Sequence, residues 1–350
     1  MNKLKLSKDS KIYVFCPAGV VTGGAELLHQ LVDVINRNHG DAYIVYVGKG
    51  EKRIPEAYSQ YLMKVADSIE DEENNIVVIY EGYYEAAFTC CNAQIVLWWL
   101  SVDHYFIYNR HTLPELIKYQ LTFPQKFELK QFLSMCKNAI LHPRNRISLR
   151  KLRKLNIACN AYQSEYAYCF LKQNGFDNLY PLKDYINSDN FEGVYPEERE
   201  DIVIYNPKKG YEFTKRLIQA APDINWIPIQ NMTRLQVIDL MRKAKIYIDF
   251  GYHPGKDRLP RESAINGCCI ITNKLGSAAF NDVDIPQQYK HNQSKNDVNK
   301  IVNQIRYIIS HFDIVSKDYD HYREIISAEK DMFENDAVRL FCLGEDKQLE

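Results

Sequence analysis

A regular alternation of short apolar segments with longer amphipathic segments constrains the fold of this chain more than any other feature. Residues 11–16, 41–47 and 75–80 are short apolar runs of the kind found in buried strands. Residues 25–36 instead repeat leucine, valine and isoleucine at helical spacing. Such an alternation predicts an α/β fold, in which helices cover parallel sheets. Further strands are predicted at 93–100, 157–163, 201–205, 224–229, 245–250 and 268–272, and further helices at 164–174, 211–220, 234–244 and 262–266.

The pattern runs in two series, which predicts two domains. A chain of 350 residues is long for one ordinary domain and has enough apolar residues for two cores. A linker-like stretch at 184–190 separates the series. We expect an N-terminal domain at 1–185, a second domain at 186–320 and a helical tail at 321–350 that packs back on the first domain. Thr233 and Gln236 have the spacing of a capping box at the start of the helix predicted at 234.

Composition excludes some classes of function. The chain has 44 Lys and Arg residues against 45 Asp and Glu residues. It therefore lacks the excess of basic residues that is typical of nucleic-acid-binding proteins. Its nine cysteines lack CxxC or Cys/His metal spacing, which is typical of reduced thiols in a cytosolic protein. No signal peptide is recognisable, and the apolar run at 95–100 is too short to span a bilayer. We expect a soluble cytoplasmic protein.

Residues 247–262 contain the most informative motif for function. An apolar strand passes into a loop with two glycines, two prolines and several charges, and then into a helix. This arrangement is typical of a ligand site at the carboxyl end of a parallel sheet. The loop offers Lys256, Arg258 and Arg261 to a phosphate, while Glu262 can accept hydrogen bonds from sugar hydroxyls. A nucleotide or a nucleotide sugar is therefore the expected ligand.

Two further loops follow the first strand of each domain. Gly23 and Gly24 open the first helix, whose N-terminal N–H groups would attract a diphosphate. An ordinary strand-to-helix turn is the alternative. Lys208 and Lys209, before Gly210, can neutralise a diphosphate leaving group in place of a metal. They can equally be solvated surface lysines.

Several of these motifs together resemble glycosyltransferases of the GT-B architecture, closest to the family 4 type. The segments 23–26 (Gly-Gly-Ala-Glu), 208–210 (Lys-Lys-Gly) and 260–264 (Pro-Arg-Glu-Ser-Ala), followed by Gly267, resemble that family's motifs in their order. The resemblance implies two Rossmann-like domains with parallel sheets facing a central cleft. It also implies a UDP- or GDP-linked sugar donor against the second domain, a glycan or lipid-linked glycan acceptor against the first, and no metal or other cofactor.

One position departs from the resemblance. Family 4 enzymes have two glutamates with seven residues between them, the first at the donor sugar and the second at the ribose. Glu262 matches the second glutamate, but Pro254 stands at the first. His253, Asp257 or Lys256 can take the place of the missing carboxylate, and we regard His253 as a candidate catalytic residue.

Candidate acceptor residues follow two strands of the first domain. Asp103 and His104 come after the strand at 93–100, on the edge of the sheet that faces the cleft in GT-B proteins. Either can bind the acceptor or act as a general base if the reaction inverts the anomeric centre. Glu81 and Tyr83 follow the strand at 75–80 and suit hydroxyl binding and sugar stacking.

The strongest charge run is the segment 144–155. It is either a solvated helix face or a basic and apolar surface that contacts an anionic membrane, since Ile147, Leu152 and Leu155 can share a face. Membrane contact would place the protein at the inner face of the cell membrane.

Together these features predict a metal-independent glycosyltransferase, which the resemblance assigns to bacterial capsule, O-antigen or exopolysaccharide biosynthesis. Two alternatives stay open. One is a nucleotide-sugar epimerase or hydrolase on the same fold, and the other is a GT-B protein that binds a nucleotide or glycan after losing catalysis.

Overall fold

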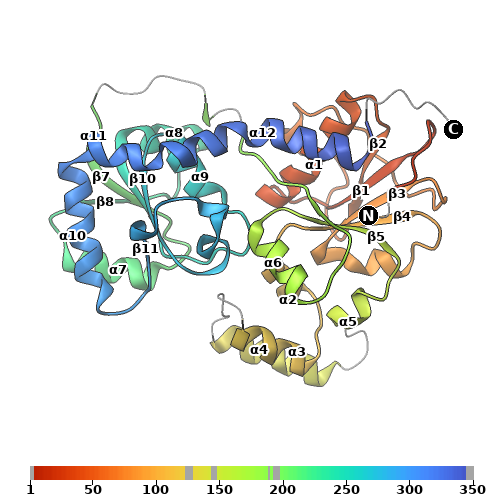
Figure 1. Ribbon diagram of the computed structural model, residues 1–350, viewed down its shortest axis with the longest axis horizontal. Coiled ribbons are helices and arrows are strands. Elements are labelled where there is room, and N and C mark those ends of the chain that lie inside the picture. The colour runs from red at the N-terminus through yellow and green to blue at the C-terminus, as the bar shows by residue number, and fades with distance from the viewer. Residues whose placement is uncertain (1–3, 123–128, 143–147, 188–189, 192–197, 344–350) are drawn as a thin grey trace. The chain divides into compact units, whose positions relative to one another are not determined.

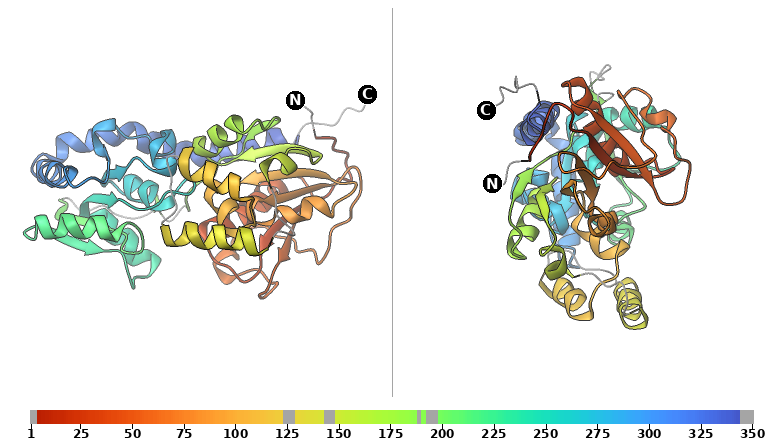
Figure 2. Two further views of the ribbon diagram at one scale, coloured as in Figure 1. Left: turned by 90° about the horizontal axis from the view of Figure 1, so that it is seen from below. Right: turned by 90° about the vertical axis from the view of Figure 1, so that its right-hand side faces the viewer.

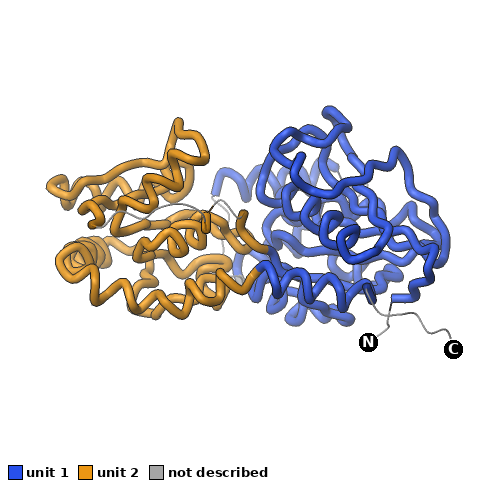
Figure 3. The backbone as a smooth tube through the Cα atoms, turned by 90° about the horizontal axis from the view of Figure 1, so that it is seen from above, with its two compact units in different colours: residues 1–122, 126–184, 330–350 blue, residues 123–125, 185–329 orange. Residues whose placement is uncertain are grey.

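The computed structural model describes residues 4–122, 129–142, 148–187, 190–191 and 198–343 (Figures 1 and 2). These residues form two compact units (Figure 3). Unit 1 contains the described residues within 1–122, 126–184 and 330–350, and unit 2 those within 185–329.

Unit 1 is built on a six-stranded parallel sheet in the order β2-β1-β3-β4-β5-β6. The strands are short and the central ones are strongly buried, as expected for a sheet covered on both faces, while the edge strand at 179–181 is partly exposed. The strands are β1 (Ile12–Pro17), β2 (Ala42–Val47), β3 (Ile76–Tyr80), β4 (Gln94–Trp99), β5 (Ile157–Tyr162) and β6 (Leu179–Pro181).

The helices of unit 1 follow its strands along the chain. The longest of those that lie wholly within unit 1, α1, packs against β1 and β2, while α6 packs against β5. Two helices, α3 and α4, pack against each other (Figure 1). The helices are α1 (Gly23–Arg37), α2 (Val102–Tyr108), α3 (Leu113–Thr122), α4 (Leu129–Leu141), α5 (Leu149–Leu152) and α6 (Glu165–Gln173).

Unit 2 is built on a five-stranded parallel sheet in the order β11-β10-β9-β7-β8. Its core is formed by the strands and by the inner faces of α7, α8, α9 and α10, together with the start of α12. The strands are β7 (Glu200–Tyr205), β8 (Asn225–Pro228), β9 (Ala244–Asp249), β10 (Cys269–Asn273) and β11 (Lys290–His291). The helices are α7 (Tyr211–Ala220), α8 (Arg234–Lys243), α9 (Arg258–Ile265), α10 (Asp297–Ser310), α11 (Phe312–Val315) and α12 (Asp320–Leu340), whose last residues belong to unit 1.

Strand order determines where each unit can bind a ligand. In unit 1 the chain leaves β1 to form β2 on one side and then β3 on the other. In unit 2 it leaves β7 to form β8 on one side and then β9 on the other. Ligands of open parallel sheets bind at such switch points, outside the carboxyl ends of the strands. The loops after β1 and β3, and those after β7 and β9, are therefore the candidate binding loops.

The prediction of two parallel α/β sheets is confirmed. The capping box of Thr233 and Gln236 is present at the start of α8, as predicted. One helix differs from its prediction, because α9 begins at Arg258 rather than at Glu262. Pro260 is compatible with this earlier start, since proline is tolerated in the first turn of a helix. Among the described residues, no helix combines the length and apolar character needed to cross a bilayer.

Candidate functional site

Two glycines allow the loops after β7 and β9 to come into contact. Gly210 has a φ of 62°, in the left-handed region, and a Cβ there would overlap the Phe250 carbonyl group. A Cβ on Gly251 would in turn lie 2.5 Å from Cβ of Lys209. Gly210 and Gly251 are therefore required for close approach of the two loops, which brings Lys209 beside the end of β9.

Four side chains from these loops form what we call the loop network: Lys209, Asp249, His253 and Asp257. The Lys209 ammonium lies 2.8 Å from Oδ2 of Asp257 and donates to the Tyr252 carbonyl at 3.1 Å. His253 is fully buried, with Nδ1 3.1 Å from Oδ2 of Asp257 and Nε2 3.7 Å from Oδ1 of Asp249. Asp249 also accepts a hydrogen bond from the Tyr247 hydroxyl at 2.7 Å. The network links the two loops at the switch point of unit 2.

Charge balance within the loop network shifts three pKa values. Burial alone would lower the pKa of His253, but the carboxylates of Asp249 and Asp257 outweigh burial and raise it. The pKa of Lys209 is raised in the same way, against the effect of burial. Burial alone would raise the pKa of Asp257, yet His253 and Lys209 lower it. Lys209 and His253 thus both lie beside the carboxylates of the network, and His253 holds the loop rather than facing solvent.

Glu262 lies in the fifth position of α9, and its side chain is almost buried. Its Oε1 is 3.3 Å from Nη2 of Arg234, the first residue of α8, whose side chain is 41% exposed. Since α8 follows β8, the pair lies on the same carboxyl edge of the sheet as the loop network. A carboxylate beside a half-exposed guanidinium can bind a hydroxyl and a phosphate together.

Two residues that were predicted to bind phosphate, Arg261 and Lys256, instead form ion pairs with Glu329. Arg261 is fully buried, and its Nη1 lies 2.7 Å from Oε2 of Glu329. Lys256 is nearly buried, with Nζ 2.6 Å from Oε1 of the same glutamate. These two cations therefore hold α12 against the loop. Among the predicted donor ligands, Lys208 is exposed and Arg258 is half-buried.

The carboxylates and imidazole of the loop network have the donor set of a metal site. One ligand atom from each of Asp249, His253 and Asp257 lies within 4.8 Å of the others. However, the Lys209 ammonium already contacts Asp257 at 2.8 Å and would repel a bound cation. The arrangement fits a neutralised ion network better than a metal centre.

The predicted residues at the switch point of unit 1 differ in accessibility. Gly23 and Gly24 form the first residues of α1, which Thr22 caps. Glu81 is buried, accepts the Leu100 N–H at 2.8 Å, and has a pKa raised by burial to about 8. Tyr83 is half-buried and packs against Phe15, with ring centroids 5.8 Å apart. Of these side chains, Tyr83 is the one that a sugar can reach.

Asp103 and His104 lie in the first turn of α2, but they face different environments. Asp103 is fully buried and accepts a hydrogen bond from the Tyr166 hydroxyl at 3.0 Å. That hydroxyl is also 2.9 Å from the hydroxyl of Tyr119. An acceptor hydroxyl cannot reach Asp103 in this conformation. His104 is half-buried and packs on Tyr108, so it is the accessible member of the pair.

The basic run at 144–155 is described from Ser148 onward, and residues 144–147 lie outside the described residues. Leu149 and Leu152 in this run are buried in unit 1. The apolar residues of α5 therefore do not form an exposed surface, although Arg150 and Lys151 are exposed.

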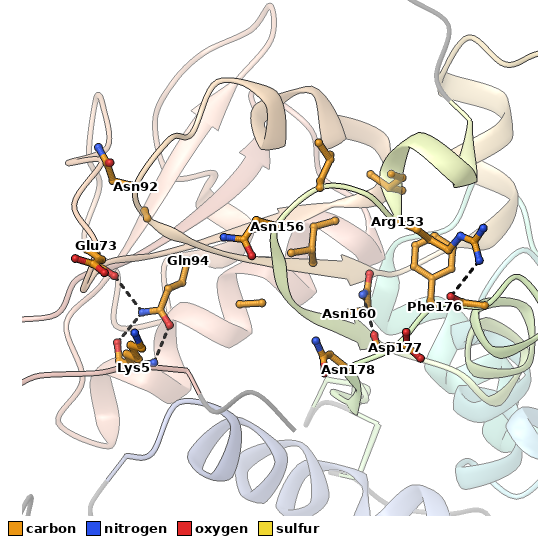
Figure 4. Close-up of a pocket in the computed structure, with 16 residues that line it drawn as sticks. Lys5, Glu73, Asn92, Gln94, Arg153, Asn156, Asn160, Phe176, Asp177 and Asn178 are labelled. Atoms are coloured by element: carbon orange, nitrogen blue, oxygen red, sulfur yellow. Dashed lines mark hydrogen bonds between the residues drawn. The ribbon is translucent and has the colours of Figure 1, made fainter.

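A cavity of about 820 Å³ lies at the opposite, amino-terminal edge of the unit 1 sheet (Figure 4). Two of the amides that line it, Gln94 and Asn160, already have partners within the protein. Gln94 donates to the carbonyls of Lys5 and Glu73, and Asn160 donates to the carbonyl of Asp177. Because parallel sheets bind ligands at their carboxyl ends, we place the candidate site in the switch-point loops instead.

Three residues of the unit 2 site were not among the functional residues predicted from the sequence. Arg234 stands directly after a helix cap on the carboxyl edge, which was a usable signal. Asp249 ends a buried strand, four residues before His253, and that i,i+4 spacing was also visible. Glu329 lies 68 residues from Arg261, and no sequence pattern indicates that contact.

Two parallel α/β sheets with candidate ligand loops at their switch points define the GT-B fold of glycosyltransferases, as predicted. Solved structures with this fold match nearly the whole chain. A glycosyltransferase from Rickettsia africae has a TM-score of 0.60 at 12% identity, with 95% of this chain and 97% of that chain covered. Sucrose-phosphate synthase from Thermosynechococcus elongatus has a TM-score of 0.57 at 13% identity, with the same coverage. Anabaena HepE, solved with UDP-glucose, has a TM-score of 0.57 at 11% identity, covering 95% and 99%.

No family model and no curated protein matches this sequence. At such low identities the structural similarity establishes the fold and leaves the activity to be argued from the site.

Proposed function

We propose that this protein is a glycosyltransferase that moves a sugar from a nucleoside diphosphate sugar to a glycan or lipid-linked glycan. The observation that carries this proposal is the loop network at the switch point of unit 2. It places a lysine, two aspartates and a histidine on the loops where open parallel sheets bind nucleotides. The GT-B fold supports the same reading, as does the UDP-glucose bound to HepE.

The donor is proposed to bind unit 2 as a UDP- or GDP-linked sugar. Glu262 accepts hydrogen bonds from the ribose hydroxyls, with Arg234 holding its carboxylate in place. Lys209 and the exposed Lys208 contact the diphosphate. Arg258 lies at the start of α9 and can add a further contact.

The chemistry that follows needs charge stabilisation on the donor side. The bond between the anomeric carbon and the diphosphate oxygen breaks, and the acceptor hydroxyl forms the new bond and releases its proton. Negative charge develops on the departing diphosphate, where a prearranged cation lowers the barrier. Lys209 supplies this charge, because Asp257 and the Tyr252 carbonyl fix its ammonium group.

The acceptor is assigned to unit 1. His104 and Tyr83 follow β4 and β3 at the carboxyl edge of the sheet and are accessible, whereas Asp103 and Glu81 are buried. His104 binds the acceptor hydroxyl, or takes its proton if the reaction inverts the anomeric centre. Tyr83 offers its ring to a sugar face.

The transfer is proposed to be independent of metal ions, since Lys209 occupies the position of a cation beside Asp257. Addition of a chelator should leave the rate unchanged. A rate that falls on chelation and recovers with Mg²⁺ or Mn²⁺ would contradict this assignment.

Synthesis of a bacterial surface polysaccharide in the cytoplasm is the proposed setting. None of the nine cysteines, all within the described residues, forms a disulfide, which suits a reducing compartment.

The first experiment is a thermal-shift panel of nucleotide sugars, followed by transfer assays with the donor that stabilises the protein most. Lys209→Met should weaken donor binding by about 10- to 150-fold, as expected for a charged hydrogen bond. Lys208→Met should have a smaller effect, because Lys208 is exposed. Lys215→Met, an exposed lysine of α7, is the matched control. Donor binding that is equal in all three variants would move the diphosphate site elsewhere.

A nucleotide- or glycan-binding protein without transfer activity is the second candidate. Pro254 is the observation that favours it, because this residue stands where the resembling family has its first glutamate. Donor binding without transfer or donor hydrolysis would support this alternative. Conversion of the donor sugar without an acceptor would indicate an epimerase or a hydrolase.

A further inference from the structure

The outer face of α3 and α4 in unit 1 is unusually apolar. The two helices lie side by side in Figures 1 and 2 and pack against each other. Leu121 and Leu129 are each 72% exposed, and Ile140 is 63% exposed. Isolated exposed leucines are ordinary, but a contiguous group on two adjacent helices marks an interaction surface.

Helical spacing places these side chains on one face of each helix. In α4, Leu129, Leu133 and Ile140 are four and seven residues apart, and therefore align. In α3, Ile117 and Leu121 are four residues apart and align in the same way. The side chains that face the interior are different ones: Leu116, Tyr119 and Ala139 are buried. Each helix is thus apolar on its outer face as well as its inner face.

The charge beside this apolar face is positive. Lys118 of α3 and Lys130 and Lys137 of α4 are exposed. Lys118 and Lys130 each follow an apolar position of the outer face by one residue and so flank that face, whereas Lys137 follows Leu133 by four residues and lies within it. The neighbouring α5 adds Arg150 and Lys151.

Little acidic charge opposes these cations. In the helices α3, α4 and α5, Glu115 is the single acidic residue. Its side chain is 12% exposed, and its carboxylate accepts the Leu149 N–H at 2.7 Å, which also anchors α5 beside α3. Lys118 donates to Oδ1 of Asn174 at 3.2 Å. Within these three helices no carboxylate matches the exposure of Lys130 and Lys137, so the described surface has an excess of positive charge.

We propose that the outer face of α3 and α4 docks on the surface of an anionic phospholipid bilayer. An apolar face between exposed lysines matches an interface in which acyl chains lie beneath negatively charged headgroups. The apolar residues enter the acyl boundary, and the lysines contact the phosphates. Within the run at 144–155, Leu149 and Leu152 are buried and contribute no apolar surface, so the apolar part of the proposed contact comes from α3 and α4.

This inference extends the proposed function without depending on it. Docking through unit 1 would hold the protein at the surface where a lipid-linked acceptor resides, and would leave the donor loops of unit 2 unaltered. The test below contains no nucleotide sugar, so a failure of docking is distinguishable from a failure of glycosyl transfer.

The experiment is co-sedimentation of the full chain with vesicles of phosphatidylcholine, with or without phosphatidylglycerol. We expect binding to the anionic vesicles that weakens with added salt, and much weaker binding to phosphatidylcholine alone. Lys118→Glu/Lys130→Glu/Lys137→Glu should reduce binding at least about 100-fold, since each lysine near an anionic surface contributes about fivefold. Leu133→Ser/Ile140→Ser should reduce it about tenfold or more.

Matched controls are available in unit 2. Leu235→Ser/Ile314→Ser changes side chains that are 68% and 69% exposed, and Lys215→Glu/Lys243→Glu/Lys300→Glu makes the same charge change. Circular dichroism and melting temperature verify that every variant is folded. Absence of binding, or equal loss in the test and control variants, would overturn the proposal. A change from dimer to monomer caused by Leu133→Ser/Ile140→Ser would assign the face to a second copy of this chain instead.

Discussion

The switch points of the two units have the same topology but opposite electrostatics. In unit 2 the buried carboxylate of Asp249 and the largely buried carboxylate of Asp257 lie beside Lys209 and His253. In unit 1 the buried carboxyl of Glu81 is held by a backbone N–H group. The pKa of Asp257 is lowered despite burial, whereas burial raises the pKa of Glu81 to about 8. Partner charge, rather than burial, therefore decides whether a buried acid remains ionised near neutral pH.

This difference assigns different tasks to the two units. A site that receives a diphosphate needs fixed cations, and unit 2 has them in its loops. A site that receives a neutral sugar needs hydroxyl and aromatic partners, and unit 1 offers Tyr83 and His104. Five predictions test this division of tasks, beginning with the largest effect.

Glu329→Gln should destabilise unit 2 by about 3–5 kcal/mol, because it leaves Lys256 and Arg261 buried without a compensating charge. Urea denaturation measures the loss. Asp223→Asn, which breaks the exposed pair with Arg306, is the control and should cost about 0–1 kcal/mol. Equal losses in the two variants would show that the buried cations of unit 2 do not need their partner.

Glu262→Ala should weaken nucleotide binding by about 1.5–3 kcal/mol, the usual contribution of a hydrogen bond to a charged group. Isothermal titration calorimetry with the preferred nucleotide measures the change. Glu324→Ala, at an exposed position in α12, is the control. Unchanged affinity in Glu262→Ala would remove this residue from the ribose site and weaken the assignment of the donor to unit 2.

Glu81 should make unit 1 less stable as the pH rises. Its folded-state pKa of about 8 exceeds the ordinary value of 4.5, so the folded protein retains the proton that the unfolded chain releases. Between these two values the contribution of Glu81 should fall by about 1.4 kcal/mol per pH unit. Glu81→Gln should lack this slope in urea denaturation across the same window.

Asp257 should show the opposite sign in the same experiment. Because its folded-state pKa is lowered, its contribution to stability is present above its ordinary value of 3.8 and is lost as the pH falls through the lowered pKa. If the stability of Glu81→Gln depended on pH as steeply as that of the unaltered protein, the electrostatic contrast between the two units would be contradicted.

Gly24→Ala should have the smallest effect, a gain of about 0.4–1 kcal/mol in stability. A Cβ at Gly24 would meet Leu100 at an ordinary distance of 3.9 Å, and α1 there has helical geometry. Gly210→Ala should instead destabilise, since its φ is positive and a Cβ would overlap Phe250. If Gly24→Ala weakened donor binding while leaving stability unchanged, the added methyl group would be obstructing a ligand. That result would place part of the donor at the first turn of α1.

Local patterns determined much of the fold in advance. The helix at 211–220 and the capping box of Thr233 were predicted at the residues where they occur, because both depend on neighbours within one or two turns. The strand pattern was similarly clear, since strands buried on both faces must be continuously apolar. The start of α9 was misplaced, because the sequence signal at Pro260 is compatible with more than one first turn.

Side-chain roles within the site needed the tertiary structure. The sequence by itself determined that charged loops follow β7 and β9, since composition and order along the chain carry that information. The tertiary structure decided which of the basic side chains face solvent. Arg261 does not, because it donates a hydrogen bond to Glu329, which is 68 residues away in the sequence. Burial of Asp103 likewise depends on Tyr166, 63 residues away. The outer face of α3 and α4 is a further case, because an apolar residue on a helix is exposed or buried according to what packs against it, and periodicity does not contain that information.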